Sequence, residues 1–438
     1  MNSFEDLLGG QRSRQFLNLN FLWPWAGEFI TVEEGADLTR PVLRSDVKTA
    51  VFDIAEDKAP GPDGYSAALA AWPVIGDELT NAVQEFFNTG KLLKQINATL
   101  LTLIPKVAAP STVGNYRPIS CCNVLYKINT KIIVQLMQQV MQKIVSPSQN
   151  AFVLGRRISN NILLAQEIFS GYNRQNFPPC CALKVDLRKA YDTLEWDFVL
   201  ASLKSFGFPS RMIAWIEECI STTAFSVSLN GGLHDFFMGA RGLRQGDPMS
   251  PYLFVLAMEV LQLLLLQRVD QSEFFQFHWN SDERSVMLFP ESLETFAHWS
   301  GLEANVHKSQ LIVSKAALDI KPRLLTILGS QEGVLPVRYL GLPLISSRLT
   351  VADCRPLLAK VDERLQGWVR LQLSFAARVQ LIRTHEEILM ARRNYHWHGQ
   401  GCLEDVCYLW RKVVKGLGRL NPLTEALCVA IYGCCAKE

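Results

Sequence analysis

The amino-acid sequence predicts a mixed α/β (α+β) protein, and three observations support this class. Short apolar runs bounded by turn residues occur among longer stretches that repeat apolar residues at helical spacing. Apolar residues make up 48% of the 438 positions, which suits a folded chain rather than a disordered one. A chain of this length can hold about two or three domains, each with its own core.

The elements expected in the first half of the chain are mostly helices. Residues 1–40 show no clean periodicity, whereas residues 46–57 repeat apolar positions at helical spacing. The segment Ala59-Pro-Gly-Pro-Asp-Gly64 is a strong turn signal, because its prolines and glycines exclude regular structure. We expect further helices over residues 72–88, 126–145 and 158–169, and a short strand over residues 99–105.

The second half combines short strands with helices. The apolar run that leads into Asp186 predicts a buried strand over residues 183–186. Residues 224–231 alternate and enter a Gly-Gly turn, which is typical of a strand. Residues 281–299 are expected to be mostly helical, with an interruption at Pro290. We expect further helices over residues 196–206, 210–220, 251–267 and 356–368, and a strand over residues 310–313.

Cysteine usage and apolar runs favour an intracellular protein, in the nucleus or cytoplasm, that is not secreted. Eleven cysteines are scattered without regular spacing, and six of them form adjacent pairs that rarely bridge, so free thiols are expected. The first residues lack a basic region followed by an apolar run, so no signal peptide is evident. The longest apolar run, from Leu253 to Leu266, is too short to span a bilayer and contains Glu259, so no membrane contact is expected.

The positive charge is concentrated in one part of the chain. From Lys91 to Lys189, thirteen Lys and Arg residues are opposed only by Glu167 and Asp186, which gives this segment a net charge of about +11. The remainder of the chain is therefore near −9. This asymmetry suggests a lobe that faces a polyanion; the alternative is a solvated basic surface.

Asp186 is the first candidate site residue. A carboxylate at the end of a buried strand, followed by a turn into a helix, can bind a catalytic metal, and two-metal chemistry needs at least two such carboxylates. Tyr191 can lie beneath an incoming sugar and exclude a 2′-hydroxyl by bulk. Asp192 and Glu195 are expected to cap the next helix, and a helix cap is also the alternative for Asp186.

Two further segments carry candidate binding residues. In Gly242-Leu-Arg-Gln-Gly-Asp-Pro248, the glycines let the backbone approach a ligand, and Gln245 can read a base or sugar edge. The alternative is an ordinary loop before a buried helix. Lys106 and Arg117 flank a loop, and two cations on one hairpin suit a triphosphate, although each alone is more often a surface charge.

These segments belong to a longer series of motifs, and the chain resembles the reverse transcriptase of plant non-LTR (LINE-type) retrotransposons. The resemblance covers roughly residues 38–384, with the motifs in the family's order. The motifs are Lys58-Ala-Pro-Gly-Pro-Asp-Gly64, Leu103-Ile-Pro-Lys106, Asn115-Tyr-Arg-Pro-Ile-Ser120, Gln149-Asn-Ala-Phe-Val-Leu-Gly-Arg156, Val185-Asp-Leu-Arg-Lys-Ala-Tyr-Asp192, Gly242-Leu-Arg-Gln-Gly-Asp-Pro248, Ser300-Gly-Leu-Glu-Ala-Asn-Val-His-Lys-Ser309 and Arg338-Tyr-Leu-Gly-Leu-Pro343.

The resemblance implies a right-hand polymerase fold with fingers, a truncated palm and a helical thumb. The implied divisions are an N-terminal extension (1–40), fingers (41–180), palm (181–315), thumb (316–385) and a divergent tail (386–438). The implied partners are an RNA template, a DNA primer and dNTP, with Mg²⁺ as cofactor; the oligomeric state stays open. The implied roles are metal binding by Asp186, sugar discrimination by Tyr191, template–nucleotide contacts by Gln245 and Gly246, triphosphate binding by Lys106 and Arg117, and protonation of pyrophosphate by Lys308.

One family motif is missing from the sequence. The family carries a Phe/Tyr-Ala-Asp-Asp hairpin after the helix that follows Gln245, and nothing of that form occurs here. The nearby pair Asp282-Glu283 is followed by Arg284-Ser285, so it is expected to begin a helix rather than form a buried strand. We therefore expect an inactive remnant, with two alternatives: a nucleic-acid-binding protein without chemistry, or an active enzyme whose true product includes the hairpin.

The tail offers a weak alternative site. His396, His398, Cys402 and Cys407 could bind zinc, but their spacing fits no standard structural site. Scattered free thiols are the expected interpretation of this segment.

Overall fold

The computed structural model describes most of the chain up to residue 346. The described residues are 2–9, 17–54, 59–65, 71–174, 179–229, 232–273, 275, 283–340, 342–346 and 359. The chain divides into two compact units, one formed by Met1–Leu164 with Arg174–Val334 and the other by Ala165–Asn173 with Leu335–Glu438. The predicted helix over 356–368, most of the predicted thumb and the candidate zinc ligands lie outside the described residues.

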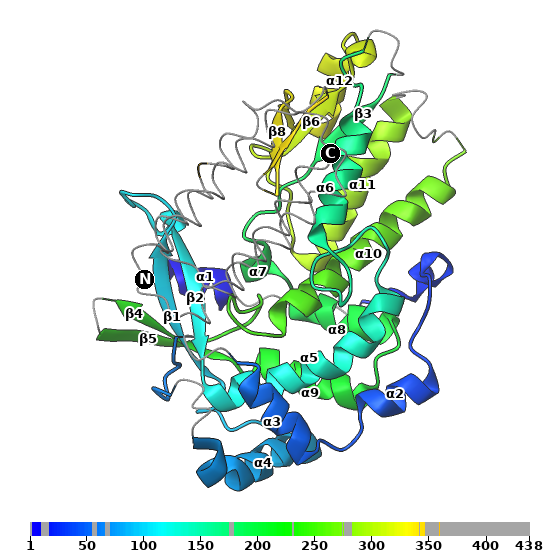
Figure 1. Ribbon diagram of the computed structural model, residues 1–438. Coiled ribbons are helices and arrows are strands. Elements are labelled where there is room, and N and C mark those ends of the chain that lie inside the picture. Colours follow the sequence, from blue (N-terminus) through cyan, green and yellow to red (C-terminus); the bar gives the residue numbers. More distant parts are fainter. Residues whose placement is uncertain are drawn as a thin grey trace, which may run out of the picture. The chain divides into compact units, whose positions relative to one another are not determined.

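The larger unit has a helical core built on two long helices, α5 (Val124–Ile144) and α10 (Ser250–Asp270). Most of α5 is buried, and one continuous apolar core includes residues of both helices. Around them pack α3 (Arg44–Phe52), α4 (Trp72–Thr89), α8 (Trp196–Ser205) and α9 (Ser210–Ser221) (Figure 1). This packed helical core supports the loops that carry the candidate site residues.

The first sheet of this unit has the strand order β2-β1-β4-β5. Strand β1 (Ala98–Pro105) pairs antiparallel with β2 (Tyr116–Cys122) and parallel with β4 (Ala224–Leu229), which pairs antiparallel with β5 (Gly232–Met238). Helix α1 (Asn2–Leu8) contributes apolar side chains to a small core with β1, β4 and β5. The β1–β2 hairpin therefore lies at one side of this sheet, with β2 as an edge strand.

The second sheet carries the segment that leads to Asp186. Strand β3 (Cys181–Lys184) pairs antiparallel with β6 (Gln310–Val313), and β6 pairs parallel with β7 (Gln331–Glu332). Helices α11 (Glu283–Ser300) and α12 (Lys321–Leu328) contribute apolar side chains to a cluster with β6. Among the described strands β3 is an edge strand of this sheet, so one side of its backbone has no strand partner there.

The turn-rich segment near residue 60 anchors the start of α5. The Asp63 carboxylate accepts a hydrogen bond from the Val124 backbone N–H at 2.8 Å. Asn123 accepts from the Asp63 N–H at 2.9 Å and donates to the carbonyl of Gln95 at 2.8 Å. The first of these bonds satisfies the Val124 N–H in the first turn of α5, as a helix cap does, and the other two tie Asn123 to the segments at Asp63 and Gln95.

The described part of the smaller unit contains the end of α6 (Ile158–Phe169) and a two-stranded sheet of β8 (Val337–Tyr339) with β9 (Leu342–Leu344). The Gln166 carboxamide donates to the Ile345 carbonyl at 2.7 Å and accepts from its N–H at 3.3 Å. This pair of bonds joins the helix end to the strand that follows it.

Most expected elements are confirmed, and the mixed α/β class is confirmed with them. Two expectations need correction. Helix α11 continues through Pro290, because the proline removes only one N–H donor and buried Val286, Leu288 and Phe296 hold the helix on both sides of it. The strand before Asp186 ends at Lys184, two residues early. Residues 1–40, where the sequence shows no clean periodicity, contain helices such as α2 (Val32–Leu38), which begins with a capping box of Thr31 and Glu34.

Helix α10 is long and apolar enough to cross a membrane by length and composition, with a mean hydropathy of 1.6 over its most apolar window. Half of that window is buried inside the protein. The core helix of a soluble protein passes the same test, so one such helix is weak evidence of a membrane span.

Candidate functional site

Asp186 lies in a turn that is bonded to the turn at residues 304–309. Its backbone N–H donates to Ser309 Oγ at 3.1 Å, and its carbonyl accepts from the Asn305 N–H at 2.7 Å. One carboxylate oxygen accepts from Asn305 Nδ2 at 3.3 Å. The exposed Lys308 belongs to this second turn, since its N–H donates to the Asn305 carbonyl at 3.0 Å. The structure thus brings the segments of Asp186 and Lys308 together.

The ring of Tyr191 is held in a fixed position by stacking. Its ring stacks on Phe254 of α10, with centroids 5.1 Å apart and an interplanar angle of 22°. Burial raises the pKa of the Tyr191 hydroxyl, so this group stays neutral. A ring fixed in this way suits the predicted role in sugar discrimination, because its position is set before any ligand arrives.

Asp192 corrects a sequence expectation. It is buried, and its carboxylate accepts a hydrogen bond from Gln245 Nε2 at 2.9 Å instead of capping the next helix. Burial raises the pKa of this carboxyl, while the bond from Gln245 and the charges of Lys189 and Lys106 oppose that shift. Glu195 stands at the N-cap position of α8 but makes no side-chain cap bond.

The loop at residues 242–248 lies directly against the turn that carries Tyr191. The Leu243 N–H donates to the Tyr191 carbonyl at 2.6 Å. Gly242 has φ +83°, and a Cβ on it would lie 2.7 Å from the Asp192 carbonyl oxygen. Only glycine fits such a close approach in this backbone conformation. The two sequence motifs therefore form one structural feature.

The same loop meets the β1–β2 hairpin on its other side. The Ser120 N–H donates to the Gln245 carbonyl at 2.8 Å, and a Cβ on Gly246 would lie 2.9 Å from the Ser120 carbonyl oxygen. Lys106 and Arg117 are exposed at the far end of this hairpin. Lys106 Nζ donates to the Gly114 carbonyl at 3.1 Å and is near enough to Asp192 to affect its pKa. Lys106, Tyr191, Gln245 and Gly246 thus surround one region.

The described residues do not fit a complete two-metal site. No group of three or more His, Cys, Asp or Glu side chains in the described part of the chain could hold a metal ion. Asp186 offers one carboxylate, and its described hydrogen-bond partner is the neutral amide of Asn305. Two-metal phosphoryl transfer needs carboxylates that converge on both cations.

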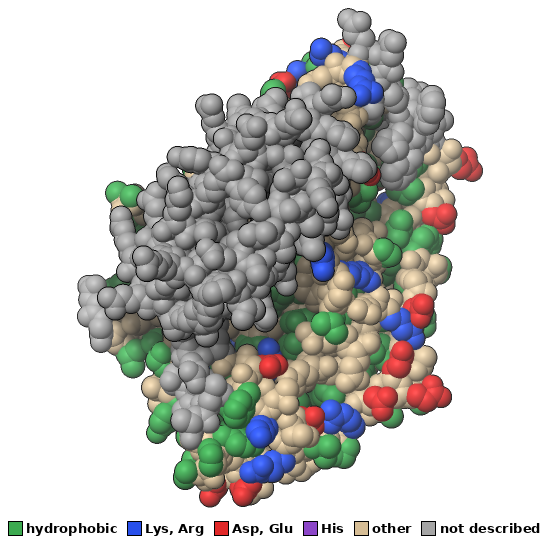
Figure 2. Space-filling view, in the orientation of Figure 1, with side chains coloured by type: hydrophobic (Ala, Val, Ile, Leu, Met, Phe, Trp, Pro, Cys, Tyr) green, Lys and Arg blue, Asp and Glu red, His purple; other side chains and the backbone are tan. Residues whose placement is uncertain are grey.

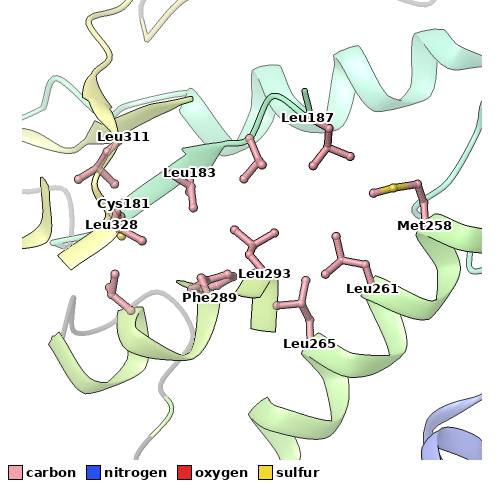
Figure 3. Close-up of a pocket in the computed structure, with 12 residues that line it drawn as sticks. Cys181, Leu183, Leu187, Met258, Leu261, Leu265, Phe289, Leu293, Leu311 and Leu328 are labelled. Carbon is pink, nitrogen blue, oxygen red and sulfur yellow. The ribbon is translucent and has the colours of Figure 1, made fainter. Parts of the chain in front are cut away.

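An apolar cavity of about 270 Å³ lies on one face of the strand that leads to Asp186. Leu183, Val185 and Leu187 line it, whereas Asp186 does not. Figure 3 shows side chains from α10 and α11 closing it from below. The remaining lining residues are Cys181, Met258, Leu261, Leu265, Val286, Phe289, Leu293, Leu311 and Leu328. The side chains that line it carry no charged or amide group, so they offer little to fix a polar ligand.

Part of the positive charge between Lys91 and Lys189 is buried or paired with carboxylates of the protein itself. Lys127 is buried and donates to the Ala59 carbonyl at 2.9 Å. Lys143 pairs with Glu34 at 3.0 Å, and Lys91 pairs with Glu218 at 3.0 Å. In the described part of the face in Figure 2, basic and acidic side chains lie near one another. The free positive charge on the described surface is therefore smaller than the sequence count suggests.

These motifs gather in one candidate site, and comparison with known proteins gives the family of the chain. The model of the reverse transcriptase (RNA-dependent DNA polymerase) family matches residues 104–344, which is more than half of the chain. The chain belongs to the reverse transcriptase family, and its mixed α/β fold agrees with that membership.

Three relatives are informative. The chain is 26% identical over 248 residues to the transposon TX1 uncharacterized 149 kDa protein of Xenopus laevis, covering 56% of this chain and 19% of that protein. It is 24% identical over 238 residues to the Pol polyprotein of the type-2 retrotransposable element R2DM of Drosophila melanogaster, covering 54% and 22%. It is 36% identical over 80 residues to an uncharacterized mitochondrial protein of Arabidopsis thaliana, covering 18% and 65%.

The chain spans about a fifth of the length of the first two relatives. Among solved structures, it is similar to telomerase from Candida tropicalis in complex with a fragment of telomeric RNA. That similarity has a TM-score of 0.40 and 13% identity, and it covers 70% of this chain and 53% of the telomerase chain.

Proposed function

We propose that this chain is the reverse transcriptase region of a plant non-LTR (LINE-type) retrotransposon that binds an RNA template, a DNA primer and dNTP inside the cell. The observation that carries this proposal is the junction of the β1–β2 hairpin, the turn at Tyr191 and the loop at Gln245. These segments are far apart in sequence but are joined by backbone hydrogen bonds. The 36% identity to an Arabidopsis segment supports the plant assignment.

Each part of this junction suits one part of a nucleotide. Lys106 and Arg117 lie on one exposed hairpin, where two cations can hold a triphosphate. The Tyr191 ring, fixed by stacking on Phe254, would offer a flat surface for a sugar and would act against a 2′-hydroxyl through its bulk. The Gln245 carboxamide can both donate and accept hydrogen bonds, and its Nε2 already donates one to the Asp192 carboxylate.

We further propose that the chain, as its sequence stands, does not polymerise. Only residues 271–282 lie between the end of α10 and the start of α11, where the family places its acidic hairpin. These twelve residues are just long enough for two strands of about five residues with a turn, so the inactivity is inferred from their sequence, which contains no adjacent pair of aspartates. The loss of a catalytic carboxylate costs orders of magnitude in rate.

Nucleotide binding tests the first part of this proposal. Fluorescence anisotropy with a labelled dNTP should show saturable binding, and Lys106→Ala should weaken it about tenfold because a charge-assisted contact is lost. Lys94→Ala is the matched control, since Lys94 is exposed at the opposite end of β1 and should leave affinity unchanged. Equal effects of the two variants would contradict the assignment.

Primer extension tests the second part. A DNA primer on an RNA template with Mg²⁺ and dNTP should show binding without extension. Extension that disappears in Asp186→Ala would overturn the proposed inactivity. Sequencing the transcript across residues 278–281 addresses the remaining possibility, because extra codons there would show that the true product includes the hairpin.

A second candidate function is nucleic-acid binding without chemistry. Its specific support is the basic segment between Lys91 and Lys189, although part of that charge is neutralised internally. Duplex affinity measured against salt decides it, since phosphate contacts release counterions and give a steep log–log slope. A flat slope would remove this candidate.

A further inference from the structure

The loop that carries Gln245 and Gly246 is fastened by a buried ion pair on either side of them. Arg244 and Asp247 flank these two residues, and only 4% and 2% of their side chains are exposed. Arg244 Nε lies 3.7 Å from an Asp247 carboxylate oxygen. Neither side chain is placed to contact a ligand, because both are enclosed by the protein.

Arg244 ties the loop to the first sheet and to α9. One guanidinium nitrogen donates to Asn97 Oδ1 at 2.8 Å and to Thr99 Oγ1 at 3.0 Å. The other donates to the Cys219 carbonyl at 2.8 Å. Burial alone would lower the pKa of Arg244, but its neighbours, including Tyr126, Cys122 and Asp247, raise that pKa, so the side chain stays charged. A planar guanidinium with several donors suits this set of acceptors.

Asp247 ties the same loop to α5 and α10. The Tyr126 hydroxyl donates to one carboxylate oxygen at 2.7 Å, and the Met249 N–H donates to the other at 2.9 Å. The Arg244 guanidinium carbon also lies 3.9 Å from the centre of the Tyr126 ring, a cation–π contact. Four elements of the fold therefore converge on two residues of one short loop.

We propose that Arg244 and Asp247 are positioning residues that hold Gln245 and Gly246 in the geometry needed to bind a nucleotide. A buried ion pair is weak evidence for stability, because well-packed apolar residues often replace one without loss. This pair instead sets the position of the two residues between its members. The Gln245 carbonyl then meets the Ser120 N–H, and its side chain faces Asp192. The inference rests on the proposed nucleotide-binding function.

Two variants should loosen the loop, although neither changes a residue of the loop itself. Tyr126→Phe removes the hydroxyl bonded to Asp247 and keeps the ring beside Arg244, and Thr99→Val removes one acceptor of Arg244 with little change of shape. The matched control is Thr80→Val, which removes a buried hydroxyl that donates to the Gly76 carbonyl at 2.6 Å within α4.

The experiment measures loop exchange and nucleotide affinity in the full chain. Hydrogen exchange of residues 242–249 should become at least tenfold faster in Tyr126→Phe, and labelled dNTP should bind at least tenfold more weakly. Thr99→Val should show smaller changes in the same direction, and Thr80→Val should show neither. Faster exchange with unchanged affinity, or affinity losses shared by Thr80→Val, would overturn the positioning role. Absence of dNTP binding by the unmodified protein would instead overturn the proposed function, and exchange alone would then test the anchoring.

Discussion

Gly242→Ala tests the close approach between the loop at residues 242–248 and the turn that carries Tyr191. Gly242 has φ +83°, and a Cβ there would lie 2.7 Å from the Asp192 carbonyl oxygen and 3.1 Å from that of Tyr191. The glycine cannot shift freely, because its N–H donates to the Leu194 carbonyl at 2.8 Å and its carbonyl accepts from Trp196 Nε1 at 2.7 Å. The substitution therefore meets both a backbone penalty and a steric one.

Gly64→Ala isolates the backbone penalty. Gly64 has φ +73°, and no atom of the described residues lies within 4 Å of the position of its Cβ. A left-handed conformation costs an alanine about 1–2 kcal/mol, so this variant should lower the free energy of unfolding by that amount. Gly242→Ala adds an overpacking cost of about 1–3 kcal/mol, for a total of about 2–5 kcal/mol.

Urea denaturation followed by circular dichroism measures the difference between the two variants. An excess loss of about 2 kcal/mol in Gly242→Ala should lower the urea midpoint by about 1 M relative to Gly64→Ala. The dNTP affinity should fall only in Gly242→Ala, because the displaced carbonyls belong to Tyr191 and Asp192. Equal midpoints for the two variants would refute the reasoning from close approach.

Two other predictions concern the cavity and the partly buried thiol of Cys181 that lines it. Val286→Leu should raise the free energy of unfolding by up to about 0.8 kcal/mol, because the added methylene enters the cavity, whereas Val83→Leu in the close-packed core should lower it by about 1–3 kcal/mol; urea midpoints check both. Burial raises the pKa of Cys181 from 9.0 to about 11, so the folded state favours the protonated thiol. The stabilisation of the folded state by this pKa difference is fully present below pH 9 and is lost as the pH rises through 11. The urea midpoint of the unmodified protein should therefore fall over this range, and that of Cys181→Ala should fall less steeply.

The sequence predicts the local elements of the site better than the contacts between them. The strand at β1 and the helix over 251–267 follow from apolar periodicity. The bond between Asp192 and Gln245 joins residues 53 positions apart, and no local pattern contains it. From local sequence, an aspartate just before an amphipathic helix, such as Asp192, is expected to be a helix cap. Its burial can be recognised only once the loop that carries Gln245 is known to pack against it.

Two strands of the first sheet were missed for related reasons. Tyr116–Cys122 contains a proline and polar residues, which favour a loop, yet it forms β2 because it pairs with β1 along its length. Pro118 is tolerated because β2 is an edge strand of the sheet. Strand β5 exposes Leu233 and Phe236, so its burial pattern gives little alternation to read. In both cases the partner strand, rather than intrinsic propensity, determines the conformation.

The two halves of the site can be separated by one variant. The described residues assemble the proposed nucleotide-binding half, whereas among them the metal half supplies a single carboxylate at Asp186. In a complete polymerase site, removing this carboxylate weakens nucleotide binding, because metal ions bridge the enzyme and the phosphates. Here dNTP affinity in Mg²⁺ should change less than twofold in Asp186→Ala, while Lys106→Ala weakens it about tenfold. A loss of affinity in Asp186→Ala that depends on Mg²⁺ would show that the metal half is complete, and the proposed inactivity would then be wrong.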